Sequence, residues 1–229
     1  MGEYQCSCNG CELRSLFFEN LEKGAYESMC AKKQQQLYPK GSLIYRQGEK
    51  ISHFSYLKSG LVKLVRNIDD KNEQIICFAC PLDFVSLLSI FSETCHQYSV
   101  IALEDSEICS LYLDEVKEMA LHNGRFALSL AEKINRASDN IILTMLNVRQ
   151  RRLLGRIAYI LLYFANEVYK SDVFDMPVSR KEIAEFIGMT TENVIRTLSE
   201  FRQDKIIRIN GKTIEIADKE KLVHISLNA

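Results

Sequence analysis

The stretch SRKEIAEFIGMTTENVIRTLSEFRQ, residues 179–203, decides how the C-terminal part of the chain folds. Ser179 and Glu182 have the spacing of a capping box, which starts a helix. Gly188 predicts a tight turn after this helix, and Thr190 predicts the cap of a second one. The stretch therefore predicts two short helices joined by a glycine turn, a helix-turn-helix.

The predicted second helix has an apolar face and a polar face. Val194, Leu198 and Phe201 recur at helical spacing, so we expect them to face inward. The other stripe consists of Glu192, Arg196, Ser199 and Gln203. An exposed helix can enter the major groove of DNA, where arginine reads guanine and glutamate accepts from cytosine. We therefore predict that Glu192 and Arg196 read bases; the alternative is an ordinary surface salt bridge between them.

Further side chains around this helix are candidates for supporting DNA contacts. Phosphate contacts position a protein on the duplex without reading its sequence. The candidates are Thr191, Asn193 and Ser199 on the helix, with Lys181, Arg202, Lys205, Arg208 and Lys212 near it. Ile195, beside Arg196, is expected to serve packing or to meet a thymine methyl group.

The segment after this helix predicts a β-hairpin. Ile207 and Ile209 alternate with polar residues, and Ile214 and Ile216 do the same. Asn210-Gly211 between them favours a two-residue type I′ turn. Together with the two helices, this hairpin predicts a winged helix-turn-helix.

Short strand-like segments occupy the chain from Tyr38 to Asp114. They comprise residues 43–45, 54–57, 61–65, 73–78, 99–103 and 107–111, with glycine or charged turns between them. Many short strands at near-regular spacing predict an antiparallel sandwich or jelly roll. Upstream, residues 16–37 have helical spacing.

A long helix is expected from Arg125 to about Val148, a segment without proline or glycine. Residues there follow alternating three- and four-residue steps, a heptad seam that needs a partner helix. The seam comprises Ala131, Ile134, Ser138, Ile141, Met145 and Val148. The partner is either the same helix of a second copy or the chain's own β-domain. Another helix is expected at residues 153–169, then a loop at 170–177.

The bulk composition narrows the class of protein. With 29 basic and 30 acidic residues and 47% hydrophobic residues, the chain can form a core but does not attract nucleic acid through its net charge. It shows no secretory signal and no apolar run that could span a membrane, so we expect a cytoplasmic protein. It also lacks the common catalytic motifs, so we expect no enzyme. A scaffold protein without DNA binding is the alternative from another class.

Over nearly its whole length the chain resembles the CRP/FNR family. The resemblance rests on residues 40–49 (KGSLIYRQGE), 56–60 (YLKSG), 155–158 (GRIA), 179–198 and 211–214. It implies a cyclic-nucleotide-binding-like sensor domain, a dimerising helix and a winged helix-turn-helix. It further implies a homodimer that binds double-stranded DNA, with RNA polymerase as another partner.

The resemblance also assigns parts of the chain. It matches Glu192 and Arg196 to the family's base-reading pair, whereas Thr191 and Ile195 depart from the pattern and leave the outer bases of the half-site open. The expected fold is α+β with four parts. They are a cysteine-rich segment at 1–15, a β jelly-roll sensor domain at 16–123, a dimerisation helix at 124–148 and a winged helix-turn-helix domain at 149–229.

The sequence argues against cyclic AMP as the signal. In the family, the phosphate site contains a Gly-Glu pair and a later Arg-Ser or Arg-Thr. The matching residues, 81–88 and 96–99, lack the glycine and the glutamate, and His96 stands in place of the arginine. The bidentate contact between guanidinium and phosphate is therefore missing.

The eight cysteines suggest another sensor. Cys6, Cys8 and Cys11 lie within six residues, and the resemblance matches Cys109 to the distant fourth ligand of the FNR branch. Four thiolates can hold a four-iron four-sulfur cluster, and they also suit zinc. The FNR branch spaces its N-terminal cysteines more widely, which makes Cys30 an alternative ligand. A metal-free thiol switch, haem or another small ligand stay open.

Overall fold

The computed structural model describes residue 24 and residues 31–69, 72–85 and 89–228. The chain divides into two compact units whose boundary lies between Asn140 and Ile141, within a long helix. The expected sequence of a β-rich domain, a long helix and a C-terminal helix-turn-helix is confirmed. None of the helices in the described ranges combines the length and apolar character needed to cross a membrane.

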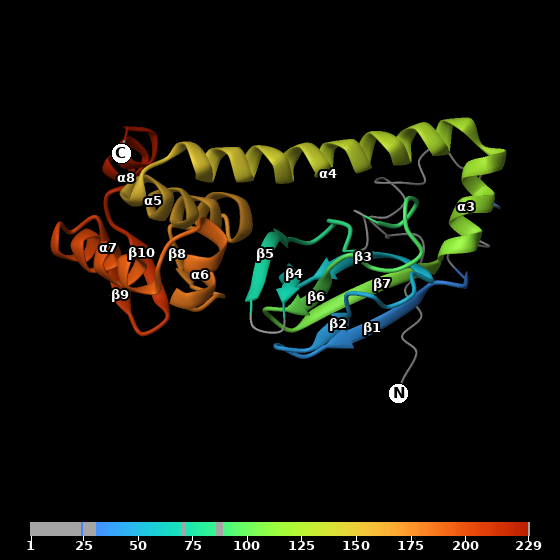
Figure 1. Cartoon of the computed structure of the whole chain (residues 1–229), viewed down its shortest axis with the longest axis horizontal. Helices are drawn as coiled ribbons and strands as arrows, with labels where there is room; N and C mark the ends of the chain where they lie inside the picture. Colours follow the sequence, from blue (N-terminus) through green and yellow to red (C-terminus); the bar gives the residue numbers. More distant parts are fainter. Residues whose placement is uncertain (1–23, 25–30, 70–71, 86–88, 229) are drawn as a thin grey trace. The chain divides into compact units, whose positions relative to one another are not determined.

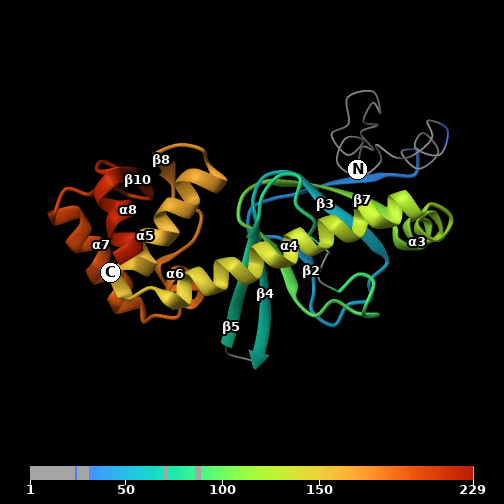
Figure 2. The same cartoon turned by 90° about the horizontal axis from the view of Figure 1, so that it is seen from above.

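Two antiparallel sheets form the first unit (Figure 1). One sheet has the order β1 (Gln34–Tyr38), β7 (Ser106–Tyr112), β3 (His53–Ser59). The other has the order β2 (Leu43–Tyr45), β6 (Ser99–Ala102), β4 (Val62–Asp69), β5 (Asn72–Ala79). Figure 2 shows β4 and β5 side by side as a long hairpin. Every strand segment predicted between residues 43 and 111 corresponds to one of β2–β7.

Strand β1 corrects the sequence prediction. Helical spacing predicted a helix that continues to Leu37, but Gln34–Tyr38 is extended and pairs with β7. Gln34 lies opposite Ser110, and Tyr38 lies opposite Ser106. Because the partner strand is far along the chain, local periodicity could not reveal this pairing.

Alternation along the strands divides the buried side chains of the first unit between two cores. Leu57, Val62, Leu64, Val100 and Ile108 come from both sheets and form one core, each at most 3% exposed. The opposite faces of β3 and β7 belong to a second core with residues of α3 (Leu113–His122) and of the following helix. The members of this second core include Phe54, Tyr56, Cys109, Leu111, Val116, Phe126 and Leu130. The first unit therefore has two sheet layers and a helical layer.

Helix α4 (Gly124–Gln150) runs without interruption for 27 residues, as the lack of helix breakers predicted. Near its start, Phe126 and Leu130 are buried in the second core, and Ile134 and Ala137 pack against that core. Other apolar side chains of α4 are exposed, namely Leu128, Ile142, Leu143, Met145 and Leu146. Such a strip on a long helix needs another surface to cover it.

The second unit combines helices with a small sheet. Helix α5 (Leu153–Tyr163) continues as a wider π-type turn, Phe164–Val168, and contacts α6 (Arg180–Ile187), α7 (Thr191–Gln203) and α8 (Lys219–Asn228). The sheet has the order β8 (Val173–Asp175), β10 (Thr213–Ile216), β9 (Ile207–Asn210). The predicted hairpin is confirmed, whereas β8 and α8 were not anticipated. β8 lies in the segment predicted as a loop.

The turn of this hairpin lies one residue later than predicted. Asn210 pairs with Thr213, so the two-residue loop consists of Gly211 and Lys212. Gly211 has φ +61°, and Lys212 is not among the residues with positive φ. A type I′ turn needs positive φ at both central residues, so the predicted type is wrong.

Candidate nucleic-acid interface

Helix α6 begins and ends as the sequence predicted. The Glu182 amide donates to the Ser179 hydroxyl at 3.2 Å, and the Ser179 amide donates to the Glu182 carboxylate at 2.7 Å. This capping box contributes about 1 kcal/mol to helix stability. Gly188 ends the helix at φ +66°, a left-handed conformation that suits glycine.

Helix α7 is oriented by its buried face. The Asn193 amide donates to the Thr190 hydroxyl at 3.3 Å, which confirms the predicted cap. Val194, Leu198 and Phe201 are at most 3% exposed. Burying this stripe leaves the opposite face of α7 in solvent.

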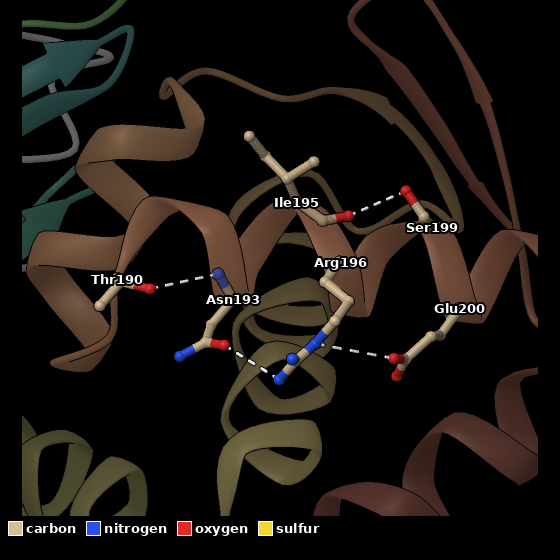
Figure 3. Close-up of polar contacts among 6 residues, drawn as sticks. All are labelled: Thr190, Asn193, Ile195, Arg196, Ser199 and Glu200. Carbon is tan, nitrogen blue, oxygen red and sulfur yellow. Dashed lines mark hydrogen bonds and ion pairs between the residues drawn. The ribbon is translucent and has the colours of Figure 1, made fainter.

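Arg196 lies on the exposed face, between two polar neighbours of its own helix (Figure 3). Its Nη2 donates to Oδ1 of Asn193 at 3.0 Å, and its Nε lies 3.8 Å from Oε1 of Glu200. The side chain remains 64% exposed. In the part of the chain that the structure describes, the ion pair of Arg196 is therefore with Glu200 rather than with Glu192. The guanidinium has five N–H donors, so these contacts orient it and leave donors for a base.

Glu192 is exposed near the start of α7 and is held locally. A hydrogen bond from its own backbone amide, and then one from the Thr190 hydroxyl, lower the pKa of its carboxyl below the ordinary value. The carboxylate is consequently charged at neutral pH and can accept a hydrogen bond from cytosine N4.

The sequence analysis did not identify the two residues that hold Arg196, Asn193 and Glu200. Their spacing of three and four residues from Arg196 is the signal that could have identified them.

The predicted auxiliary residues surround this face. Thr191, Asn193 and Ser199 are half-buried, and the Ser199 hydroxyl donates to the Ile195 carbonyl at 2.9 Å. The predicted phosphate contacts are all exposed: Lys181, Arg202, Lys205, Arg208 and Lys212. Lys181 lies 3.5 Å from Glu185, and Arg208 pairs with Glu215 across the hairpin. Their contacts with DNA stay predictions.

A further arginine, whose role the sequence did not reveal, fixes the turn between α6 and α7. The Nη1 atom of Arg156 donates to the carbonyls of Ile187 and Gly188, at 3.0 and 3.2 Å. Its Nε donates to the Arg151 carbonyl at 2.9 Å, just after α4 ends. One half-buried side chain thus links the residue that follows α4 to the helix-turn-helix turn.

The predicted seam needs a correction on α4. Val148 is 6% exposed, so other residues of the chain already cover it, and Ile134 packs against the core of the first unit. Ala131 and Met145 are exposed, and Ser138 and Ile141 are half-exposed. The accessible stripe therefore keeps Ala131, Ser138 and Met145 of the predicted seam, and Ile142, at 53% exposure, takes the place of Ile141.

The predicted metal ligands Cys6, Cys8 and Cys11, and the alternative Cys30, lie outside the described residues. Cys109 is 0% exposed on β7; burial raises the pKa of its thiol, and hydrogen bonds with Tyr56 and Gln35 partly oppose this. Within the described ranges, no three His, Cys, Asp or Glu side chains are grouped to hold a metal ion. Of the predicted ligands, the described residues therefore include Cys109.

The first unit also buries several polar side chains. His96 is 2% exposed and stacks on Tyr45 with ring centroids 4.7 Å apart. Burial lowers the pKa of His96, while Glu49 opposes this. Among the described residues, three side-chain atoms are buried without a hydrogen-bond partner, namely Nδ1 of His96, Oγ of Ser89 and Nε2 of His53. Nearby in the fold, the Tyr45 hydroxyl lies 2.5 Å from the Ser55 hydroxyl.

Known proteins are similar to the chain in both units. Residues 35–123 match the cyclic nucleotide-binding domain, and residues 155–225 match the Crp-like helix-turn-helix domain. The transcriptional activator protein Anr of Pseudomonas protegens is 28% identical over 95% of this chain and 91% of its own. The fumarate and nitrate reduction regulatory protein of Yersinia pestis is 25% identical over 82% and 77%. The structure of FixK2 from Bradyrhizobium japonicum has a TM-score of 0.76 at 22% identity, over 86% of this chain and 98% of FixK2.

Proposed function

Because the chain belongs to the CRP/FNR family of DNA-binding transcriptional regulators, we propose that it reads a specific DNA sequence as a homodimer. The observation that supports this most directly is the exposed face of α7, with a charged Glu192 and an oriented Arg196. Arg196 donates to guanine O6 and N7, and Glu192 accepts from cytosine N4. The exposed basic residues around α7 contact phosphates. RNA polymerase is a partner by family resemblance.

The DNA-reading proposal is tested by selecting binding sites from random duplexes with the full-length protein. We expect a symmetric site whose half-sites lie about 34 Å apart, one turn of the helix. In that site, Arg196→Ala should lose about 1–3 kcal/mol of preference for its G·C pair. Lys205→Gln should instead weaken binding to all DNA sequences equally, and it should reduce the salt dependence of binding by about one counterion.

The control for loss of an arginine is Arg149→Ala, since Arg149 is an exposed residue at the end of α4. It should leave the base preference unchanged. Unaltered base preference in Arg196→Ala would refute the assignment of Arg196. Failure to bind any duplex in a salt-dependent manner would favour the scaffold alternative over a DNA-binding regulator.

The homodimer forms along the exposed stripe of α4 in this proposal. Leu128, Ala131, Ser138, Ile142 and Met145 follow the heptad pattern and lie on the accessible side of the helix. Ile142→Glu would place two carboxylates in the seam and should shift the protein to monomers in sedimentation experiments. Arg136→Glu, at a nearby exposed position off this stripe, is the control and should remain dimeric. A dimeric Ile142→Glu variant would disprove the seam.

For the signal, the proposal is oxygen or redox sensing by a four-iron four-sulfur cluster bound to Cys6, Cys8, Cys11 and Cys109, with Cys30 as the alternative ligand. The support is the cysteine pattern and similarity to a relative whose name refers to fumarate and nitrate reduction. When bound, such a cluster supplies a redox-sensitive centre. Cys109 contributes a thiol that must first lose its proton, because burial favours the neutral form.

Anaerobic purification with iron, sulfide and visible-absorbance measurements tests the cluster. We expect the wild-type protein to be coloured and Cys109→Ser to lose the colour. Cys95 is a partly buried cysteine outside the proposed set, so Cys95→Ser is the control and should keep the colour. A colourless, metal-free protein that still binds DNA would rule the cluster out. A thiol switch would then show as DNA binding that changes on oxidation.

A second candidate signal is a small polar ligand held within the first unit. The observation in its favour is that Nδ1 of His96 is buried without a hydrogen-bond partner, because a buried polar atom usually has one. Native mass spectrometry of the purified protein should detect a retained small molecule. His96→Phe should release it, and an identical ligand-free mass for both proteins would exclude this candidate.

A further inference from the structure

We propose that Ile195 is a specificity-determining residue whose side chain contacts the C5 methyl group of a thymine beside the base pairs read by Glu192 and Arg196. The proposal rests on the proposed DNA-reading function of α7. It goes further because it names a chemical feature of the half-site that the charged pair does not read.

The position of Ile195 follows from the geometry of α7. Each helical residue is rotated about 100° from the one before. Ile195 therefore lies about 60° to one side of Glu192, and Arg196 lies about 40° to the other side. Val194 and Leu198, which are at most 3% exposed, mark the opposite, inward side. All three side chains thus belong to the face that would enter the groove.

The exposure of Ile195 agrees with this placement. Its side chain is 52% exposed, and along α6 and α7 it is the large hydrophobic residue that the structure leaves open to solvent. Figure 3 shows it projecting from α7 in a different direction from Arg196 and its partners. Ile195 therefore reaches a part of the groove that the guanidinium does not occupy.

The chemistry of the side chain selects its contact. Isoleucine has no hydrogen-bonding group, and the apolar group that B-DNA presents in the major groove is the thymine methyl. A G·C pair at the same place would be unfavourable, because isoleucine would exclude water from the polar edges of its bases without offering them a hydrogen bond. Isoleucine is also β-branched and nearly fixed at χ1 within a helix, so little side-chain freedom is lost on contact.

A local hydrogen bond directs the polar group next to Ile195. The Ser199 hydroxyl, one turn further along, donates to the Ile195 carbonyl at 2.9 Å. The hydroxyl is thereby directed to the backbone of its own helix. The donor of this hydroxyl is consequently occupied within α7, while its oxygen can still accept a hydrogen bond.

The test uses the DNA site selected by the full-length protein. Each thymine of that site is replaced singly by deoxyuridine, which removes the C5 methyl and nothing else. A single replacement in one half-site, next to the pair on which Arg196 depends, should weaken binding about fourfold, the value of one buried methyl group. Changing both half-sites should weaken binding about 15-fold, because distant contacts add.

The partner variant is Ile195→Ala, which should bind the thymine and the uracil duplexes equally well. The control is Val223→Ala, which removes another exposed β-branched side chain, on α8, and should keep the full response to uracil. Circular dichroism checks that each variant is folded.

The outcomes separate this proposal from the function on which it rests. If selection yields no specific site, the DNA-reading function itself fails. If a site is selected and Arg196→Ala loses its base preference, but no uracil replacement depends on Ile195, the function stands and the thymine contact is disproved. If uracil weakens binding equally in the wild type and in Ile195→Ala, the methyl group is read by another residue, and the proposal is also overturned.

Discussion

Substitution of Arg156 by lysine should destabilise the second unit substantially. The guanidinium makes three hydrogen bonds, to the carbonyls of Arg151, Ile187 and Gly188, at 2.9–3.2 Å. A lysine keeps the charge but presents one ammonium group and cannot reproduce this fork. If two bonds are lost, each worth about 1.5 kcal/mol at the lower end for a charged donor, the loss is about 3 kcal/mol.

Thermal and urea unfolding of the full-length protein, followed by circular dichroism, measures this loss. For a unit of this size, 3 kcal/mol corresponds to a fall in Tm of roughly 12–24 °C. Arg149→Lys, at an exposed position, is the control and should change the unfolding free energy by less than about 0.5 kcal/mol. If Arg156→Lys unfolds at the wild-type midpoint with an unchanged m-value, these hydrogen bonds do not stabilise the turn and the reasoning is wrong.

Two further predictions concern the first unit. Burial lowers the pKa of His96 below 6.5, so the unfolded chain binds more protons as the pH falls through that value, and the unit should lose stability between about pH 7.5 and 5. His96→Phe keeps an aromatic ring against Tyr45 but cannot bind a proton. The urea midpoint of this variant should fall less between the two pH values than that of the wild type, and an equal fall would show that His96 does not cause the loss of stability. Gly60→Ala should cost about 3 kcal/mol or more in thermal unfolding, because φ is +94° and the added methyl would lie 2.4–2.5 Å from oxygen atoms. Gly41→Ala has a similar φ but open space around it, so an equal cost for both variants would show that sterics do not matter at Gly60.

The helix-turn-helix was predictable because its signals act over a few residues. Ser179 with Glu182, Gly188 and Thr190 each stabilise a helix end next to them, and the structure confirms all three. The inward stripe on α7 was predictable for the same reason, since helical spacing fixes which residues share a face. The exposed positions of Glu192 and Arg196 follow directly from it.

The heptad pattern of α4 was less informative about its contacts. Apolar spacing shows that a helix has faces to bury, but it does not state which surface covers each face. Ile134 packs against the first unit and Val148 is covered by the chain itself, so the accessible stripe differs from the predicted one. Ile142, next to the predicted seam residue Ile141, is a candidate for the seam because its side chain is exposed.

The sequence by itself determined the strands β2–β7, the helix ends around the glycine turn and the polar face of α7, because these depend on residues within a turn or two. The tertiary structure decided the features that join distant segments. It paired β1 with β7, placed the hairpin turn at Gly211-Lys212 and linked Arg156 to the turn after α6. Such contacts depend on strand register and packing across long stretches of chain, and no local pattern of side chains encodes them.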